Sequence, residues 1–176
     1  FRGALAGGGT GLVNEGWIGV LDNAGTVTSS GYVTFSGPPV PISGVGGAVS
    51  NQGTIDSFRN TGVVGRGAVG IFNTGRITDL GNAGTIAASG AALVTTGTIG
   101  RLVNTGAIQA ANAVSNSGAI DLLVNAGSIG SGRGVVPDAG IDNRGVIGRL
   151  ENSGVIDGIA NSGQIGSIAN SGTIGP

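Results

Sequence analysis

Aliphatic residues, asparagines and glycines recur along this chain in one short unit, h-x-Asn-x-Gly-x-h, where h is aliphatic or Phe. The first h is apolar in every copy, as at Leu12, Phe58 and Ile168, and the second is always Ile or Val. A spacing of two residues places the first h and the Asn on one face of an extended chain, while the positions between them vary in character. The pattern therefore predicts short strands with one buried face.

Glycine separates these strands from one another. Because Gly disfavours a helix and is free to adopt positive φ, we expect it to supply the bend between successive strands and to exclude a helical solenoid. In the middle of the chain the glycines recur every 22 residues, at Gly31, Gly53, Gly75 and Gly97. Near the end they recur every 9 residues, at Gly145, Gly154, Gly163 and Gly172. The last spacing predicts either 18-residue coils of two strands or 27-residue coils of three.

These features predict an all-β fold, a parallel β-helix (β-solenoid) with about 18–22 residues per coil. Inside such a rod the Asn side chains of successive coils form hydrogen bonds with each other, which offsets a burial cost of about 1–3 kcal/mol per amide. Thr95 replaces the Asn in one copy, so we expect a local gap there. The predicted ladder consists of Asn51, Asn60, Asn73, Asn82, Asn104, Asn116, Asn125, Asn143, Asn152, Asn161 and Asn170.

Two stretches interrupt the repeat, and another precedes it. We expect residues 1–11 to form an N-terminal cap or flanking segment, and residues 12–176 to form the solenoid with loop insertions at 37–47 and 130–140. Proline lacks the amide donor that strand pairing needs, and insertions at one corner of a solenoid often carry binding. The candidate contact residues are Pro38, Pro39, Pro41, Arg133, Pro137 and Asp138.

Composition removes several classes of function. Only 10% of the 176 residues are charged, and the net charge of −1 offers no basic face to nucleic acid. No apolar run is long enough for a membrane-spanning helix, so we expect no membrane insertion by this segment. The absence of Cys excludes disulfides and thiolate metal sites. Because the chain opens at Phe1 without a leader, we expect it to be a mature or excised fragment.

Two strings resemble known sites but fit the repeat better. Residues 65–70 match the G-x-G-x-x-G dinucleotide fingerprint, yet they lie between two repeats without the βαβ unit that the fingerprint requires, so we interpret them as a corner turn. An ice-binding threonine array would be broken by Arg76, which stands between Thr54 and Thr98.

Trp17, the only Trp, is expected to belong to a cap that shields the first coil.

The acidic residues do not form a catalytic or calcium-binding pattern. Asp56, Asp121 and Asp157 do not recur in adjacent coils, as the ligands of a calcium-binding β-roll would. Asp79 and Arg101 share a register and should stack as a cross-strand ion pair. With no His, no Lys and no acidic cluster, we expect no catalysis, no metal and no cofactor.

The three copies at 152–156, 161–165 and 170–174, of the form Asn-Ser-Gly-x-Ile, resemble the passenger repeats of bacterial type V autotransporter adhesins. The resemblance covers about residues 12–174 and implies a right-handed β-helix that is exported through the outer membrane to the cell surface. The expected function is a non-catalytic structural or adhesive rod whose partner is a host or bacterial surface protein, a glycan, or another copy of itself. A carbohydrate-active β-helix, in which Asp56 or Asp79 would act, and a self-assembling fibre module are the alternatives.

Overall fold

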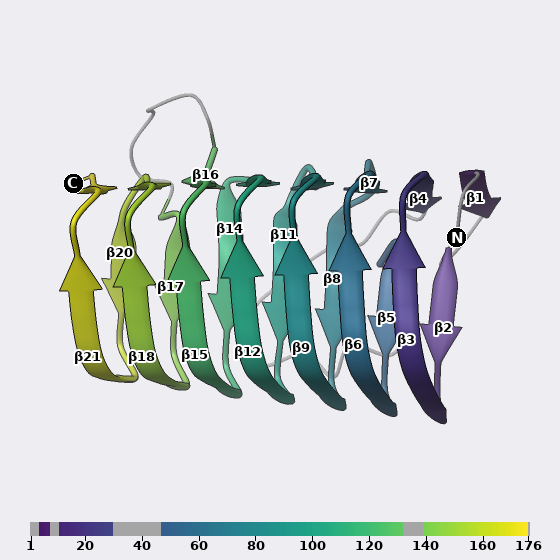
Figure 1. Cartoon of the computed structure of the whole chain (residues 1–176), viewed down its shortest axis with the longest axis horizontal. Coiled ribbons are helices and arrows are strands. Elements are labelled where there is room, and N and C mark those ends of the chain that lie inside the picture. The colour runs from purple at the N-terminus through teal and green to yellow at the C-terminus, as the bar shows by residue number, and fades with distance from the viewer. Residues whose placement is uncertain (1–3, 8–10, 30–46, 132–138, 176) are drawn as a thin grey trace.

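The computed structural model describes residues 4–7, 11–29, 47–131 and 139–175. Within these residues the chain forms strands and no helix, and all strand pairs are parallel. Three sheets, one of eight strands and two of seven, run the length of the molecule (Figure 1). The predicted fold class, an all-β parallel β-helix, is confirmed.

The three sheets are named A, B and C. Sheet A contains β1 (Ala4–Gly7), β4 (Thr26–Ser29), β7 (Val63–Gly65), β10 (Thr85–Ala87), β13 (Ala107–Gln109), β16 (Ser128–Gly130), β19 (Val155–Ile156) and β22 (Thr173–Ile174). Sheet B contains β2 (Leu12–Asn14), β5 (Val49–Asn51), β8 (Val69–Asn73), β11 (Ala91–Thr95), β14 (Asn112–Asn116), β17 (Ile141–Asn143) and β20 (Ile159–Asn161). Sheet C contains β3 (Trp17–Asn23), β6 (Thr54–Asn60), β9 (Arg76–Asn82), β12 (Thr98–Asn104), β15 (Ala119–Asn125), β18 (Val146–Asn152) and β21 (Gln164–Asn170).

Each coil takes one strand from each sheet, in the order B, C, A. In Figure 1 the chain rises through sheet C on the near side, crosses sheet A at the top and descends through sheet B on the far side, while it advances from right to left. This winding is right-handed, the usual hand for connections between parallel strands. The strand β1 extends sheet A by pairing with β4, so sheet A begins within the segment 1–11.

The core consists of aliphatic side chains stacked in register from coil to coil. Fully burying one such side chain contributes roughly 1.5–3 kcal/mol, and the columns repeat this contribution in each coil. One column in sheet C holds Ile55, Ile77, Ile99, Ile120 and Ile147, and a second holds Phe58, Leu80, Leu102, Leu123 and Leu150. Sheet A contributes Val64, Ile86, Ile108 and Ile129, and sheet B contributes Val49, Ile71, Leu93 and Val114.

Every coil has three strands, whatever its length. Equivalent asparagines lie 22 residues apart in the middle of the chain, 27 apart between Asn116 and Asn143, and 18 apart between Asn143 and Asn161. Neither alternative expected for the end of the chain holds, because the coil there has 18 residues and β20, β21 and β22 still occupy all three sheets. The shorter coil loses residues from the corner between sheets A and B, which shrinks to residues 157–158.

The repeat glycines are required by close stacking rather than by positive φ. The described glycines with positive φ are Gly65, Gly130 and Gly158, and none of them belongs to an Asn-x-Gly unit. A Cβ added at Gly75 would overlap the carbonyl oxygen of Gly53 in the preceding coil, and one at Gly97 would overlap that of Gly75. The corners of successive coils therefore approach so closely that only Gly fits, which corrects the expectation that Gly serves by its conformational freedom.

We predict that Gly97→Ala lowers the free energy of unfolding by about 1–3 kcal/mol, because the new methyl group has no space against Gly75. Gly16→Ala is the matched control, since Gly16 holds the same motif position but nothing lies within 4 Å of a Cβ added there. Urea denaturation followed by circular dichroism measures both variants. Equal destabilisation of the two would contradict the stacking explanation.

Candidate functional site

The asparagines form two ladders, one at each Asn-x-Gly corner. Within each ladder the Nδ2 of one Asn donates to the Oδ1 of the next, at 2.7–2.8 Å. The ladder between sheets B and C contains Asn14, Asn51, Asn73, Thr95, Asn116, Asn143 and Asn161. The ladder between sheets C and A contains Asn23, Asn60, Asn82, Asn104, Asn125, Asn152 and Asn170.

Each ladder Asn joins two coils through several bonds. Asn104, which is fully buried, donates to Asn125 Oδ1 at 2.8 Å, to the Ser128 carbonyl of the next coil at 3.0 Å and to the Gly106 carbonyl of its own corner at 3.2 Å. Among the described residues no buried side-chain nitrogen or oxygen lacks a partner. The asparagines therefore have a structural role, and their hydrogen-bonding capacity is used within the rod.

Thr95 interrupts the first ladder. Its Oγ1 accepts from Asn73 at 3.1 Å, but no side-chain hydrogen bond among the described residues continues from Thr95 to Asn116. The Oδ1 of Asn116 accepts instead from the backbone N–H of Gly118, at 3.2 Å. Thr has no amide donor to extend toward the next coil, which is the reason a gap is expected at this position.

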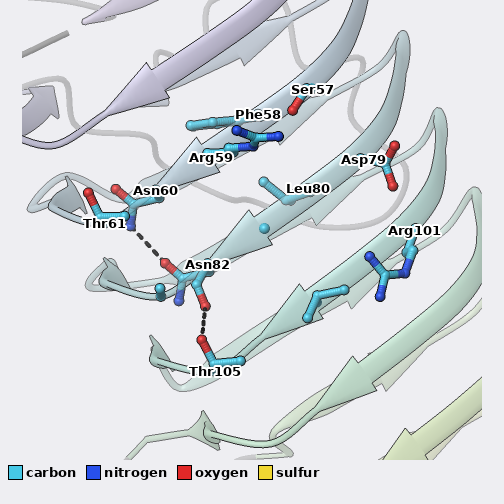
Figure 2. A pocket seen from close by; sticks show the side chains of 13 residues that line it. Ser57, Phe58, Arg59, Asn60, Thr61, Asp79, Leu80, Asn82, Arg101 and Thr105 are labelled. Atoms are coloured by element: carbon cyan, nitrogen blue, oxygen red, sulfur yellow. Dashed lines mark hydrogen bonds between the residues drawn. The ribbon is translucent and has the colours of Figure 1, made fainter.

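A shallow groove of about 500 Å³ lies on the outer face of sheet C, across strands β6, β9 and β12. Its charged lining residues are Arg59, Asp79 and Arg101, and Gly81 lies between Arg59 and Val103 in the strand register. Figure 2 shows the three charged side chains standing on three successive strands of the sheet. The groove is open to solvent and lined by both polar and apolar atoms.

Gly81 leaves the groove open, although no steric constraint requires glycine at this position. A Cβ added there would meet only the carbonyl oxygen of Phe58, at 4.0 Å. Glycine within a strand is less favourable than a residue with a side chain by roughly 0.5–1 kcal/mol. The neighbouring coils carry Val103 and Val124 at this register position. The sequence signal was present, because Gly81 is the one glycine among the residues that directly precede a repeat Asn, but sequence reasoning missed the groove.

Asp79 and Arg101 are adjacent in register, as predicted, but they do not form the expected ion pair. The ion pairs among the described residues join Arg144 to Asp142 at 3.1 Å and Arg149 to Glu151 at 2.8 Å. Two exposed side chains on neighbouring strands gain little from pairing in water, since the Coulomb term is offset by lost side-chain entropy. Both charged groups are therefore exposed to solvent without an ion-pair partner among the described residues.

Trp17 lies on the outer face of sheet C, at the start of β3, instead of covering the first coil as expected. Its side chain is 71% exposed, and its indole N–H donates to Asp56 on the adjacent strand β6 at 3.0 Å. The ring lies over Gly19, where an added Cβ would be only 3.1 Å from Cη2 of the indole. Gly19 and Asp56 together hold the indole against the sheet with much of its surface in solvent.

The remaining sequence candidates are dispersed. Residues 66–68 form the corner between β7 and β8, and the rest of the 65–70 string lies at the ends of these two strands, in agreement with the corner-turn interpretation. Asp121 is exposed on sheet C, while Asp157 lies at the corner between β19 and β20. No cluster of three or more His, Cys, Asp or Glu that could hold a metal occurs in the described residues. The same part of the chain contains no helix able to cross a bilayer.

The predicted contact residues lie outside the described residues. They are Pro38, Pro39, Pro41, Arg133, Pro137 and Asp138. The described strands nevertheless fix where these segments enter the coil. One segment joins β4 to β5 and the other joins β16 to β17, so both connect sheet A to sheet B at the same corner.

No family model matches the chain, and neither a curated protein nor a solved structure matches it significantly. The fold is thus established by the structure alone. The similarity to autotransporter passenger repeats rests on the Asn-Ser-Gly-x-Ile motif and stays a prediction.

We predict that Thr95→Asn raises the free energy of unfolding by about 1 kcal/mol, because the new amide can donate to Asn116 and close the gap. Asn104→Ala, in the uninterrupted ladder, should lower it by about 1–3 kcal/mol, since Asn82 would lose its acceptor. Urea denaturation measures both changes. Destabilisation by Thr95→Asn would show that the Thr methyl group matters more at this position than the missing hydrogen bond.

Proposed function

We propose that this chain is a non-catalytic structural and adhesive segment of a secreted or surface-displayed bacterial protein. In this proposal the solenoid is a rod-like spacer, and the segments inserted at the corner between sheets A and B make contacts with the partner. The observation that carries the proposal is that the three corners of the coil differ in how much their length varies. Two corners are kept constant by stacked asparagines and glycines, and the third varies in length from residues 157–158 to residues 30–48.

The rod continues unchanged past both insertions, which supports its role as a scaffold. Asn14 donates to Asn51 at 2.7 Å across the first insertion, and Asn116 donates to Asn143 at 2.7 Å across the second. These distances match those between coils that have no insertion. A corner that tolerates extra residues without disturbing the stack can present different contact segments on one side of the molecule.

The spacing of the two insertions is set by the strands. They leave sheet A after β4 and β16, which are separated by four strand steps in the order of that sheet. At about 4.8 Å per step, the strand ends from which the two segments leave sheet A are roughly 19 Å apart along the rod. The proposed partner is a surface protein or glycan, or another copy of the chain, and the proposed location is the cell surface after export through the outer membrane.

The test replaces each insertion by the corner of a neighbouring coil. Residues 30–46 are exchanged for the Ser-Gly of positions 89–90, and residues 132–138 for a single Ala, as at position 111. We expect the doubly replaced chain to keep its unfolding midpoint, because the ladders already continue past these corners. Beads coated with it should lose attachment to host or bacterial cells that beads coated with the native chain retain.

The two single replacements are the matched controls, since each leaves one insertion in place. Full attachment by the doubly replaced chain would reject the assignment of contacts to the corner segments. Absence of attachment by the native chain would reject the adhesive part of the proposal. Release of reducing ends from a polysaccharide, abolished by Asp79→Asn or Asp56→Asn, would favour a carbohydrate-active protein instead.

A further inference from the structure

We propose that the outer face of sheet C binds an acidic polysaccharide, a chain of pyranose sugars that carries carboxylate or sulfate groups. The binding site is the groove lined by Arg59, Asp79, Gly81 and Arg101, and Trp17, at the start of strand β3 on the same outer face, is a separate stacking platform. The inference deepens the proposed adhesive function, on which it rests for its biological meaning. It concerns other residues, however, because the groove is built from the rod itself and not from the corner segments.

Three arginines without an ion-pair partner stand on three successive strands of this face. Arg59 is on β6, Arg76 on β9 and Arg101 on β12, and no salt bridge within the described part of the chain involves any of them. All three are exposed. A guanidinium group matches the geometry of a carboxylate or sulfate with two parallel N–H donors, which makes it the side chain best suited to such groups.

The residues that line the groove carry one more positive than negative charge, although Asp22 and Asp56 stand elsewhere on the same face. Asp79 is the one carboxylate that lines it, against two arginines. Asp22 lies beside Arg59 on the opposite side from Gly81, and Asp56 accepts the indole N–H of Trp17. Asp79 can accept hydrogen bonds from sugar hydroxyls, which gives the groove a reason to prefer a saccharide over a simple anion.

The folding of the rod does not explain why position 81, at the base of the groove, has no side chain. No neighbour lies close enough to require glycine there, and the next coils carry valine at the same register. A side chain at position 81 would stand between Arg59 and Val103 and fill the groove. Leaving this position without a side chain admits a ring-sized group between the arginines.

Trp17 supplies the apolar contact that sugar rings need. Its indole is 71% exposed, yet it is held in place by the hydrogen bond to Asp56 and by the close approach to Gly19. An aromatic face fixed in this way can stack on the C–H face of a pyranose with little loss of side-chain freedom. Tryptophan, with a large apolar ring and a polar N–H, is enriched at interfaces.

The platform and the groove can be reached by one extended polymer. Trp17 is in register with Thr54, and Thr54 with Arg76, so the indole and the Arg76 guanidinium start from positions about 10 Å apart along the rod axis. Arg59 and Arg101 are likewise two strands apart. Because Trp17 and Arg76 stand at the start of their strands and Arg59 and Arg101 stand further along theirs, a polysaccharide that contacts all four would run obliquely across the strands.

The same face contains an internal control. A second, smaller groove of about 340 Å³ is lined by Arg149 and Glu151. Arg149 is in register with Arg101 through Leu122, but its guanidinium is already paired with Glu151 at 2.8 Å. In the second groove, therefore, the arginine at this register position is neutralised by Glu151. We expect Arg149→Ala not to affect binding to the first groove.

The experiment measures binding to the whole chain by isothermal titration calorimetry with two polymers. Heparin carries sulfates and carboxylates, and polygalacturonate carries carboxylates alone. We expect binding that weakens as salt is raised. Gly81→Val and the double variant Arg59→Ala/Arg101→Ala should each lower the affinity by roughly tenfold or more, and Trp17→Ala by about threefold to tenfold. Arg149→Ala should leave it unchanged.

Gly81→Val separates loss of binding from loss of folding. Because valine occupies this register position in the next two coils and a Cβ at position 81 meets no close neighbour, this variant should unfold at the same or a higher urea concentration than the native chain while it loses the ligand. Undiminished affinity of Gly81→Val, or of the double arginine variant, would overturn the assignment of the groove. A destabilised Gly81→Val would leave Arg59→Ala/Arg101→Ala as the deciding variant.

Further ligands distinguish the chemistry. Binding of heparin alone would identify sulfate as the recognised group, and binding of both polymers would show that carboxylate suffices. Equal affinity for neutral dextran, equal affinity for polyglutamate, or no binding of either acidic polysaccharide would overturn the proposal. The doubly corner-replaced chain distinguishes this inference from the proposed function, since it should still bind the polysaccharide in solution even if bead attachment is lost.

Discussion

The fold depends on how closely consecutive coils approach at the two Asn-x-Gly corners. There the backbone of one coil rests directly on that of the next, leaving no space for a Cβ, and the asparagines hydrogen-bond from coil to coil along the interior. A buried amide with no partner is costly, so each Asn is stable only where the next coil supplies an acceptor in register. The ladders consequently hold the aliphatic columns of the three sheets in line as well.

The same constraint explains why the third corner is free to vary. The corner between sheets A and B has no asparagine ladder, and the strands on either side of it are aligned by their own parallel neighbours. Residues can be added or removed there without shifting the stack. The solenoid thus combines a constant cross-section on two corners with variable connections on the third, which is the combination that the proposed spacer with contact segments requires.

The residues on the outer faces of the sheets are likewise not needed for the stability of the fold. Packing and hydrogen bonding use the inward residues, so an outward residue such as Arg59 or Gly81 can change without affecting the core. On sheet C this freedom brings together unpaired arginines, an open floor and an immobilised indole within a few strands. In the second groove, Glu151 occupies the register position that Gly81 holds in the first groove. Its carboxylate pairs with Arg149 and neutralises that arginine.

The sequence alone determined the fold class, the inward positions and the 22-residue coil, because each of these follows from a local repeat of Asn, Gly and aliphatic residues whose spacing is visible in one dimension. It also located the interruptions and the irregular rung at Thr95. The structure decided that there are two ladders, that an 18-residue coil keeps three strands, and that Asp79 and Arg101 do not pair. It also decided that Trp17 lies on the outer face and that Gly81 opens a groove. These properties depend on which residues meet across coils and how much room they have, and such contacts exist only after the chain has wound into three sheets.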